Sequence, residues 1–351
     1  MKKISSLGLV ALAAALLAAG TAQAQNITLT QEAGSAGGAS DISAKNLAEI
    51  AAANNIATIQ VQAGKTLTKS VLQVAQGKTD IAASPFVLPF LLSKGLGPYS
   101  GVGKEKGKVL SANMRLLYPY HIASFYLIAF QTTGIDSYAK LKDKIVHNGP
   151  PRGAALVTAR QMIALTTGYR EGKDYTGKQI AWGQATSIFL DRSVDAALRP
   201  GTNPSEFMPI YMAAGKVNII SVPKAKYESK AWQRYLKAPG NVAHVFPVKQ
   251  LAHYGPEARI ISEDDTFRTI ANACGDMVHK KMDKKLAKAL TAGFIKGLPN
   301  LYRKAAFARS SQFGNVDDKT MGICKSKIKF HPGAIEAWEE AGYKLPDCAK
   351  P

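Results

Sequence analysis

The sequence predicts an α/β protein of two lobes, each a mixed sheet flanked by helices, joined by crossing strands. Short strands alternate with amphipathic helices in two separate blocks, residues 27–85 and 144–204. Both blocks contain a similar segment, at Leu72–Pro85 and Ile188–Pro200. In each copy a helix, a turn ending in Asp, a small apolar strand and a proline follow one another. A segment used twice in this way indicates two similar lobes, although the chain has no strict repeat.

The first block predicts three short strands with helices between them. Hydrophobic spacing and capping residues set the expected bounds. They are a strand at 27–30, a Gly-rich loop at 34–38, a helix from the N-cap candidate Ser40, a strand at 58–62, a loop at 63–66, a helix at 67–76 and a strand at 80–83.

The second block repeats this order. We expect a strand at 144–148, a loop at 149–153, a helix at 154–165, a short helix at 187–192, a strand at 194–198 and a loop at 199–204. Between the blocks, residues 114–130 are rich in β-branched and aromatic side chains and predict a strand that crosses between the lobes. The chain is expected to return to the first lobe within residues 242–262. A helix is expected at 286–295.

The N-terminal segment predicts export. Residues 1–3 form a short basic start, residues 7–19 are almost continuously apolar, and Ala22-Gln23-Ala24 is a small-x-small cleavage site. This order is typical of a secretory signal peptide rather than of a buried helix. No later segment reaches the roughly 20 apolar residues that span a bilayer. We therefore expect a mature protein that begins at Gln25 and is located in the periplasm.

These segments give the expected division of the chain. Residues 1–24 form the signal peptide, 25–130 the first part of lobe one, 131–245 lobe two, and 246–351 the second part of lobe one with the C-terminal helices. Two discontinuous lobes joined by crossing strands leave a cleft between them, where the strand-to-helix loops converge.

The formal net charge of +20 first suggests a nucleic-acid partner. However, the lysines are spread along the whole chain, aromatic residues are not interleaved with them, and exported proteins rarely meet nucleic acid. We therefore expect no nucleic-acid partner and interpret the charge as a solvated basic surface that also favours anionic solutes.

Motifs of catalysis are missing from the sequence. It has no G-x-S-x-G turn and no H-E-x-x-H helix, and its six histidines lack the spacing of metal ligands. Gly64-Lys65-Thr66 ends like a phosphate-binding loop, but that motif needs glycine at the position of Ile59. We therefore expect no enzyme, no cofactor and no metal site.

The strand-to-helix loops contain Gly, Ser, Thr, Pro and cationic side chains. Helix N-termini carry unpaired N–H groups and a partial positive charge, so several of them converging on a cleft form an anion site. The candidate ligand-binding residues are Ser35, Gly38, Ser40, Lys65, Thr66, Ser84, Tyr118, Arg152, Gly153, Ala154, Arg199 and Thr202.

Arg152 is the residue we expect to pair with an acid group. It lies among prolines and glycines beside an expected helix N-terminus, and a planar guanidinium binds a carboxylate through two hydrogen bonds. The alternative is a surface arginine that shields a helix start. Lys65 and Arg199 occupy comparable loops. Tyr118 ends an apolar strand, so we expect it to pack in the core; the alternative is a position on the cleft wall.

Cysteine is sparse in this sequence. Cys324 and Cys348 bracket one expected helix in the tail, and we predict a disulfide between them. Cys274 lies in an apolar, strand-like segment and is expected to be a buried free thiol. The odd count leaves one unpaired thiol whichever pair forms.

Several of these stretches together resemble a known family of receptors. They are Gly34–Ser40, Ala63–Thr68, Gln76–Ala82, Ile135–Val146, Gly149–Gly153 and His331–Gly342. The chain resembles the TRAP-transporter solute receptors of the TAXI type. This resemblance implies a type II periplasmic-binding-protein fold and a monomer. It also implies capture of a small organic anion in the cleft and delivery to the membrane permease subunits of a TRAP transporter.

The sequence departs from this family in two loops. Lys65 and Thr66 follow Gly64 where the family has Gly-Ser and a nearby Asn, and Pro151-Arg152-Gly153 replaces a Gly-Ser-Gly run. Both changes add cations, so the ligand is not carried over from the glutamate- or 2-oxoglutarate-binding relatives. A carboxylate, dicarboxylate or sulfonate is expected. Two alternatives are the receptor of an ABC importer with the same fold and a periplasmic enzyme on this scaffold.

The signal peptide gives the first testable prediction. Periplasmic protein should have lost residues 1–24 and begin at Gln25, because signal peptidase cleaves after small-x-small sites. Intact-mass spectrometry of protein from the periplasmic fraction checks this. A mass that includes residues 1–24 would contradict it.

Overall fold

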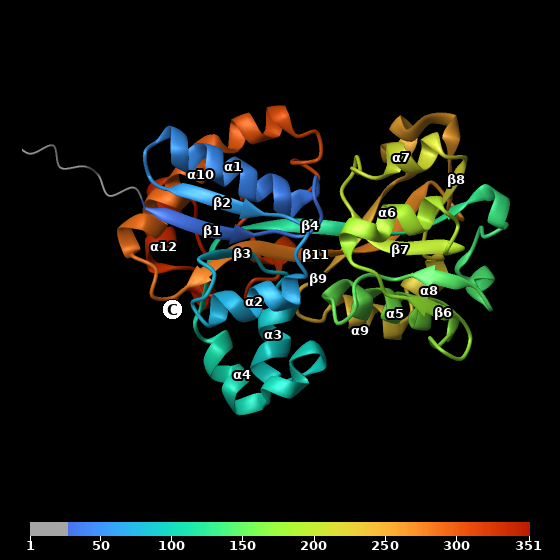
Figure 1. Ribbon diagram of the computed structural model, residues 1–351, viewed down its shortest axis with the longest axis horizontal. Helices are drawn as coiled ribbons and strands as arrows, with labels where there is room; N and C mark the ends of the chain where they lie inside the picture. The colour runs from blue at the N-terminus through green and yellow to red at the C-terminus, as the bar shows by residue number, and fades with distance from the viewer. Residues whose placement is uncertain (1–26) are drawn as a thin grey trace, which may run out of the picture.

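The computed structural model describes residues 27–351, and the expected signal peptide lies outside the described residues. Two groups of strands and helices lie side by side, and the long strands β4 and β11 pass from one group to the other (Figure 1). The strand order is β2-β1-β3-β11-β4-β7-β5-β6; in addition β8 pairs with β4, β10 with β8, and β9 with β11. This arrangement confirms the predicted fold class. Within residues 27–351, no helix has the length and apolar content needed to cross a bilayer.

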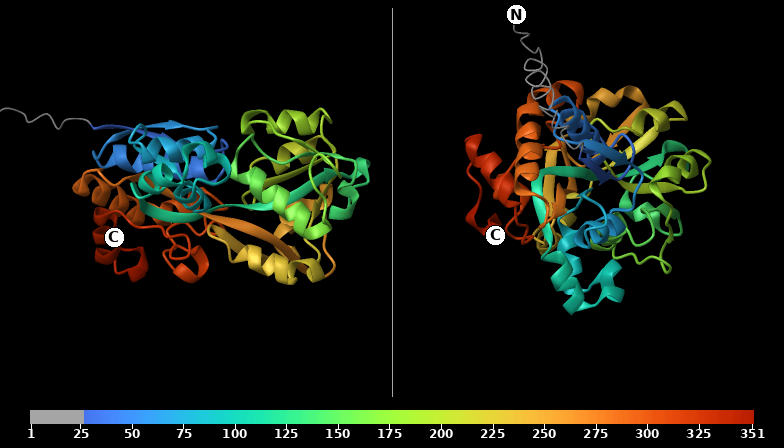
Figure 2. Two further views of the ribbon diagram at one scale, coloured as in Figure 1. Left: turned by 90° about the horizontal axis from the view of Figure 1, so that it is seen from below. Right: turned by 60° about the vertical axis from the view of Figure 1, so that its left-hand side comes forward.

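The first lobe is a sheet covered by helices on both faces. Its strands are β1 (Thr28–Glu32), β2 (Thr58–Gln62) and β3 (Ile81–Ala83), which are parallel to one another. Its helices are α1 (Ala39–Ala53), α2 (Leu67–Ala75), α3 (Val87–Lys94), α4 (Lys104–Ser111), α10 (Lys284–Lys304), α11 (Asp318–Met321) and α12 (Pro332–Glu340). The C-terminal helices stay with this lobe (Figure 2).

The second lobe has the same kind of layers. Its strands are β5 (Ile145–His147), β6 (Thr176–Lys178), β7 (Ala196–Gly201), β8 (Val217–Ile220), β9 (Asn241–Pro247) and β10 (Ala258–Ile261). Its helices are α5 (Ala154–Thr167), α6 (Trp182–Leu190), α7 (Met208–Ala213), α8 (Lys224–Tyr227) and α9 (Lys230–Leu236), with the 3-10 helix η4 (Val248–Glu257) before β10.

Two strands cross between the lobes. β4 (Met114–Phe130) pairs with β11 (Thr266–His279) in the first lobe, then with β7 and β8 in the second. Both strands are buried along almost their whole length. This agrees with the nearly continuous apolar sequence of β4, whereas β11 also buries polar side chains such as Arg268, Asn272 and Asp276. β4 and β11 connect the two lobes.

The segment that occurs twice makes the same contact in both lobes. The Asp that ends each turn accepts a hydrogen bond from a backbone N–H of the neighbouring strand, at 2.8 Å in both cases. The donors are Thr30 to Asp80 in the first lobe and Ile145 to Asp195 in the second. β3 and β7, which follow these aspartates, pair in parallel with β1 and β5. The sequence segment that occurs twice therefore forms the same local structure in both lobes.

The predicted boundary at residues 245/246 is wrong. β10 pairs with β8 of the second lobe, and Phe246, Leu251 and Tyr254 share a hydrophobic core with residues of α6 and α7. The chain returns to the first lobe only along β11. The sequence of β9 does not show which lobe the strand belongs to, because three of its seven residues are exposed and only two are buried.

Three smaller expectations also need correction. Helix α1 begins at Ala39 with Gly38 as its N-cap, and the Ser40 hydroxyl instead accepts a hydrogen bond from the Gly34 N–H at 3.1 Å. Helix α6 begins five residues before the expected position, at Trp182, and β7 runs to Gly201.

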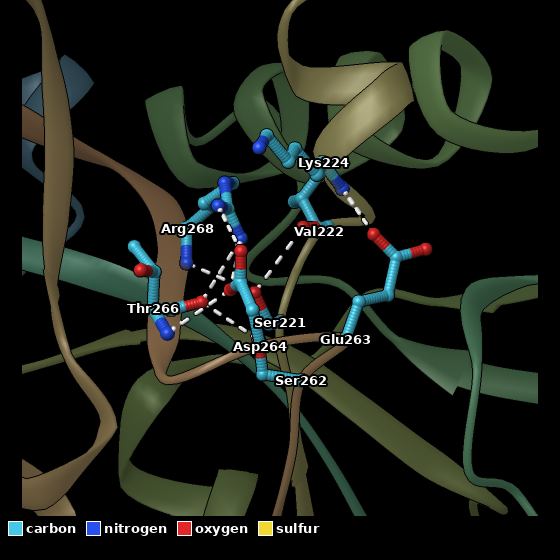
Figure 3. Close-up of polar contacts among 8 residues, drawn as sticks. All are labelled: Ser221, Val222, Lys224, Ser262, Glu263, Asp264, Thr266 and Arg268. Atoms are coloured by element: carbon cyan, nitrogen blue, oxygen red, sulfur yellow. Dashed lines mark hydrogen bonds and ion pairs between the residues drawn. The ribbon is translucent and has the colours of Figure 1, made fainter.

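A turn between β10 and β11 fixes the start of the returning strand (Figure 3). Arg268 donates two hydrogen bonds to the Asp264 carboxylate, each at 2.8 Å, and the Thr266 N–H donates a third at 3.0 Å. Beside it, the Ser221 hydroxyl accepts from the Arg268 N–H at 2.9 Å. The bonds from Arg268 lower the pKa of Asp264 to about 2. This turn anchors β11 to the second lobe.

The cysteines are arranged as expected from the sequence. Cys324 and Cys348 form a disulfide with their Cα atoms 5.6 Å apart. Cys274 is a buried free thiol on β11. The disulfide ties the end of the chain to the segment that follows α11.

One buried carboxylate joins four elements of the first lobe. Asp276 on β11 is fully buried and accepts four hydrogen bonds at 2.7–2.9 Å. The donors are Gln31 on β1, Ser43 on α1, and Tyr118 and Tyr120 on β4. Burial raises the pKa of Asp276, and the hydrogen bonds oppose that shift.

Asp276→Ala should lower the free energy of unfolding by about 3–5 kcal/mol, because four buried donors lose their acceptor. Urea unfolding of the mature protein measures this. Asp347→Ala serves as the matched control, since the Asp347 side chain is 99% exposed, and should change stability by less than about 0.5 kcal/mol. Equal stability of the two variants would show that the Asp276 cluster contributes nothing.

Candidate ligand-binding site

A cavity lies between the two lobes, bordered by strand-to-helix loops from both. The space between its walls is about 720 Å³, part of it open to solvent. Its lining residues are Gly34, Ser35, Gly38, Ala39, Ser40, Thr66, Leu67, Pro85, Ile122, Ala123, Phe125, Pro150, Gly153, Ala154, Ala155, Trp182, Pro200, Gly201, Thr202, Glu206 and Asn272. Most of these are small or apolar, and Glu206 is the one ionisable side chain among them.

Four helices begin at the cavity wall, two from each lobe. Their first-turn residues on the wall are Ala39 and Ser40 of α1, Leu67 of α2, Ala154 and Ala155 of α5, and Trp182 of α6. Because every helix leaves its first N–H groups without a partner inside the helix, these groups need acceptors from elsewhere. The cavity therefore receives the positive ends of four helices.

None of these four N-termini is capped by a side chain. Their N-cap residues are Gly38, Thr66, Gly153 and Ala181. Among the helices that begin away from the cavity, α9, α10, α11 and α12 are capped by side-chain acceptors, whereas α3, α4, α7 and α8 are not. What distinguishes the cavity is that four uncapped N-termini meet there. First-turn N–H groups that no side chain caps suit an acid group of a bound molecule.

Backbone contacts fix the first-lobe loops. The Gly64 N–H donates to the Gly34 carbonyl at 2.6 Å, and the Lys65 N–H donates to the Ala33 carbonyl at 2.9 Å. These two bonds hold the loop before α1 against the loop before α2. The N-termini of both helices are thereby fixed on the same wall of the cavity.

Seven of the residues predicted from the sequence lie on the wall of the cavity. They are Ser35, Gly38, Ser40, Thr66, Gly153, Ala154 and Thr202. Five others are placed elsewhere: Lys65, Ser84, Tyr118, Arg152 and Arg199. The cavity wall thus contains the small and polar residues of the predicted loops, whereas the predicted cations Lys65, Arg152 and Arg199 lie outside it.

Arg152, the expected partner of an acid group, does not line the cavity. Its side chain is exposed and its backbone is left-handed, with φ of 59°. This conformation turns the loop so that the neighbouring Pro150 and Gly153 lie on the wall instead. The position agrees with the alternative interpretation, a surface arginine at a helix start. Lys65 is half-buried and also lies outside the lining.

Ser84 and Tyr118 belong to the core of the first lobe. The Ser84 hydroxyl donates to the Ala82 carbonyl at 3.2 Å, and Pro85 takes its place on the wall. Tyr118 stacks on Phe294 with 3.5 Å between ring centroids and donates to Asp276. Core packing, the default role expected for Tyr118, is the role that the structure shows.

Arg199 is buried next to the cavity without lining it. Its guanidinium carbon lies 3.8 Å from the centroid of the Phe207 ring and 5.5 Å from that of Trp182. It donates to the Tyr211 hydroxyl at 2.7 Å, while its Nε has no hydrogen-bond partner. Burial, followed by this charge, lowers the pKa of His147 to about 4. Arg199 therefore adds positive potential behind the Trp182 wall.

The sequence reasoning missed the apolar walls and Glu206. Trp182 was missed because the expected start of its helix was placed five residues too late. Ile122 and Phe125 lie on β4 and Asn272 on β11, where the sequence pattern indicates only buried strands. No cluster of His, Cys, Asp and Glu within residues 27–351 is arranged to hold a metal ion.

Solved structures with similar architecture define the class of fold. The periplasmic binding protein BugD is 15% identical, with 91% of this chain and 99% of that chain covered and a TM-score of 0.53. A protein from Bordetella bronchiseptica RB50 is 11% identical, with coverage of 90% and 98% and a TM-score of 0.53. A periplasmic transporter is 11% identical, with coverage of 91% and 96% and a TM-score of 0.52. The fold is that of the two-lobe periplasmic binding proteins.

The chain belongs to the NMT1-like family, whose sequence pattern matches residues 31–342. Among curated proteins, none matches the sequence.

Trp182 gives this cavity a spectroscopic probe. The chain has three tryptophans, and Trp232 and Trp338 are fully buried away from the cavity. A molecule that enters the cavity should therefore change tryptophan emission through Trp182. Trp182→Phe should abolish the response, and Trp338→Phe should retain it. A response that survives in Trp182→Phe would place the bound molecule elsewhere.

Proposed function

We propose that this protein is an extracytoplasmic solute receptor that captures a small organic anion in the cavity between its lobes. The observation that carries this proposal is the set of four uncapped helix N-termini, two from each lobe, that line one cavity. A carboxylate, dicarboxylate or sulfonate placed there would accept hydrogen bonds from backbone N–H groups. Arg199 and the net charge of +20 add attraction at longer range.

The apolar wall suits the body of the solute. Leu67, Phe125 and Trp182 contribute to it from both lobes and from a crossing strand. Pockets that bind small molecules combine such walls with a few polar groups that fix the orientation. We therefore propose a solute with an acid group and a compact apolar body.

The two-lobe structure supports capture by closure. α1 and α2 belong to one lobe and α5 and α6 to the other, so a bound acid group would bridge the lobes. Such a ligand stabilises the closed arrangement because it gains contacts there that the open arrangement lacks. The crossing strands β4 and β11 would serve as the hinge.

The proposed partner is the membrane permease of a TRAP transporter of the TAXI type, as the resemblance of the sequence implies. The alternative is an ABC importer, whose receptors share this fold. The neighbouring genes distinguish the two systems: a gene for a fused membrane permease would favour the TRAP system, and a gene for an ATPase would favour the ABC importer. We propose no enzymatic reaction, because Glu206 is the one ionisable side chain on the cavity wall, and no second acid or base lines the cavity beside it.

Ala154 allows a direct test of anion binding. It is the first residue of α5, lines the cavity and is half-buried. Ala154→Glu should weaken binding of acids by about thirtyfold or more, because it adds a like charge to the acid site. Ala154→Gln has nearly the same size without the charge and should weaken binding much less.

The measurement is a thermal-shift screen of the mature protein with carboxylates, dicarboxylates, sulfonates, neutral sugars and amines. Calorimetry of the strongest hits on both variants follows. At least one acid should raise the melting temperature in wild type, as expected when a ligand binds the native state. Failure of every acid, or equal losses in Ala154→Glu and Ala154→Gln, would contradict the proposed function.

A further inference from the structure

Glu206 is unusual for an anion-binding cavity. It follows β7 in the second lobe, and it is the one acidic side chain on a wall that otherwise carries small, apolar and neutral polar residues. An acid group approaching the helix N-termini would meet this carboxylate in the same space. Like charges brought together in a water-poor site repel strongly.

Glu206 also reaches the opposite lobe. A Cβ atom added at Gly37 would lie 3.3 Å from the Glu206 Cβ, and one added at Gly38 would lie 3.6 Å from Oε1. The Glu206 carboxylate is therefore next to the N-cap of α1, at the point where the two lobes meet over the cavity. A group bound by Glu206 lies close to the proposed acid site.

The carboxylate has no cation in contact with it. Among the ion pairs of residues 27–351, none includes Glu206. Its side-chain hydrogen-bond donor is the Thr202 hydroxyl, at 3.4 Å from Oε2. Burial raises the pKa of Glu206. The hydrogen bond from its own backbone N–H, the charge of Arg199 and the hydrogen bonds from Thr202 oppose this shift only in part. Glu206 is half-buried, and its carboxylate has hydrogen-bond donors but no paired cation.

We infer that Glu206 binds a protonated amine of the solute, so that the captured molecule is a zwitterion. Its acid group would lie at the helix N-termini and its ammonium group at Glu206. This inference rests on the proposed function and narrows its ligand class. An ammonium supplies the missing cation and offsets the repulsion between Glu206 and the acid group, whereas a hydroxyl supplies only a hydrogen bond. Glu206 thereby discriminates against acids that lack an amine.

Matched acids test the inference by calorimetry. One series is leucine, 2-hydroxy-4-methylpentanoate and 4-methylpentanoate. The other is 5-aminopentanoate, 5-hydroxypentanoate and pentanoate. If another acid binds best in the screen, the same comparison uses that acid and its amino derivative. The amino compound should bind at least about tenfold more tightly than its hydroxy and unsubstituted partners.

Two variants assign the preference to Glu206. Glu206→Gln keeps the size and removes the charge, so the preference for the amine should fall to about twofold or less. Glu49→Gln is the control, because Glu49 is an exposed surface residue paired with Lys304, and it should keep the wild-type preference. Melting temperatures without ligand show that both variants are folded.

The pH dependence gives a second readout. Glu206 loses its charge as the pH falls below its raised pKa, so the affinity for the amino compound should decrease on acidification. The affinity for the unsubstituted acid should rise over the same range, and Glu206→Gln should show neither change.

The possible results separate this inference from the proposed function. Unsubstituted acids that bind as tightly as their amino partners, or an amine preference that survives in Glu206→Gln, overturn the inference and leave the anion receptor intact. If no acid of any class binds, the proposed function fails and the inference fails with it.

Discussion

The geometry of the first lobe depends on the buried carboxylate of Asp276. Its four donors come from β1, α1 and β4, and the carboxylate itself belongs to β11. Ser43, one of these donors, lies one helical turn after the cavity residues of α1, and Tyr120 lies two residues before Ile122 on the cavity wall. The same hydrogen-bond cluster around Asp276 therefore holds the helix and the strands that form one side of the cavity. No cation pairs with Asp276, because all four donors are neutral. The buried carboxylate therefore depends on all four hydrogen bonds for its stabilisation.

The segment that occurs twice fixes the strands in both lobes. Asp80 and Asp195 each fix the strand that follows them against a parallel neighbour. Parallel strands end at the same edge of a sheet, and the helices after them begin there. This is why two lobes with little sequence in common both present helix N-termini, and why the cavity lies where the two edges face each other.

The sequence contained enough information for the architecture and for part of the site. The segment that occurs twice, with its turn ending in Asp, predicted two similar lobes. The strand-to-helix loops predicted seven residues of the cavity wall. The cations were harder to place, because a loop's sequence does not tell which side chains turn outward. Arg152 takes a left-handed backbone and points to solvent, and Arg199 is covered by Phe207. Glu206 follows a loop whose path across the cleft is set by tertiary packing, so no local pattern marks it.

The central claim is that backbone N–H groups of both lobes, rather than exposed cations, hold the acid group of the solute. A crystal structure of the mature protein with the tightest-binding acid tests it most directly. The acid oxygens should lie about 2.7–3.2 Å from backbone nitrogens in the first turns of helices from both lobes, such as α1 and α5. Acid oxygens bound instead to Arg152 or Lys65, or a ligand outside the cavity, would contradict the account.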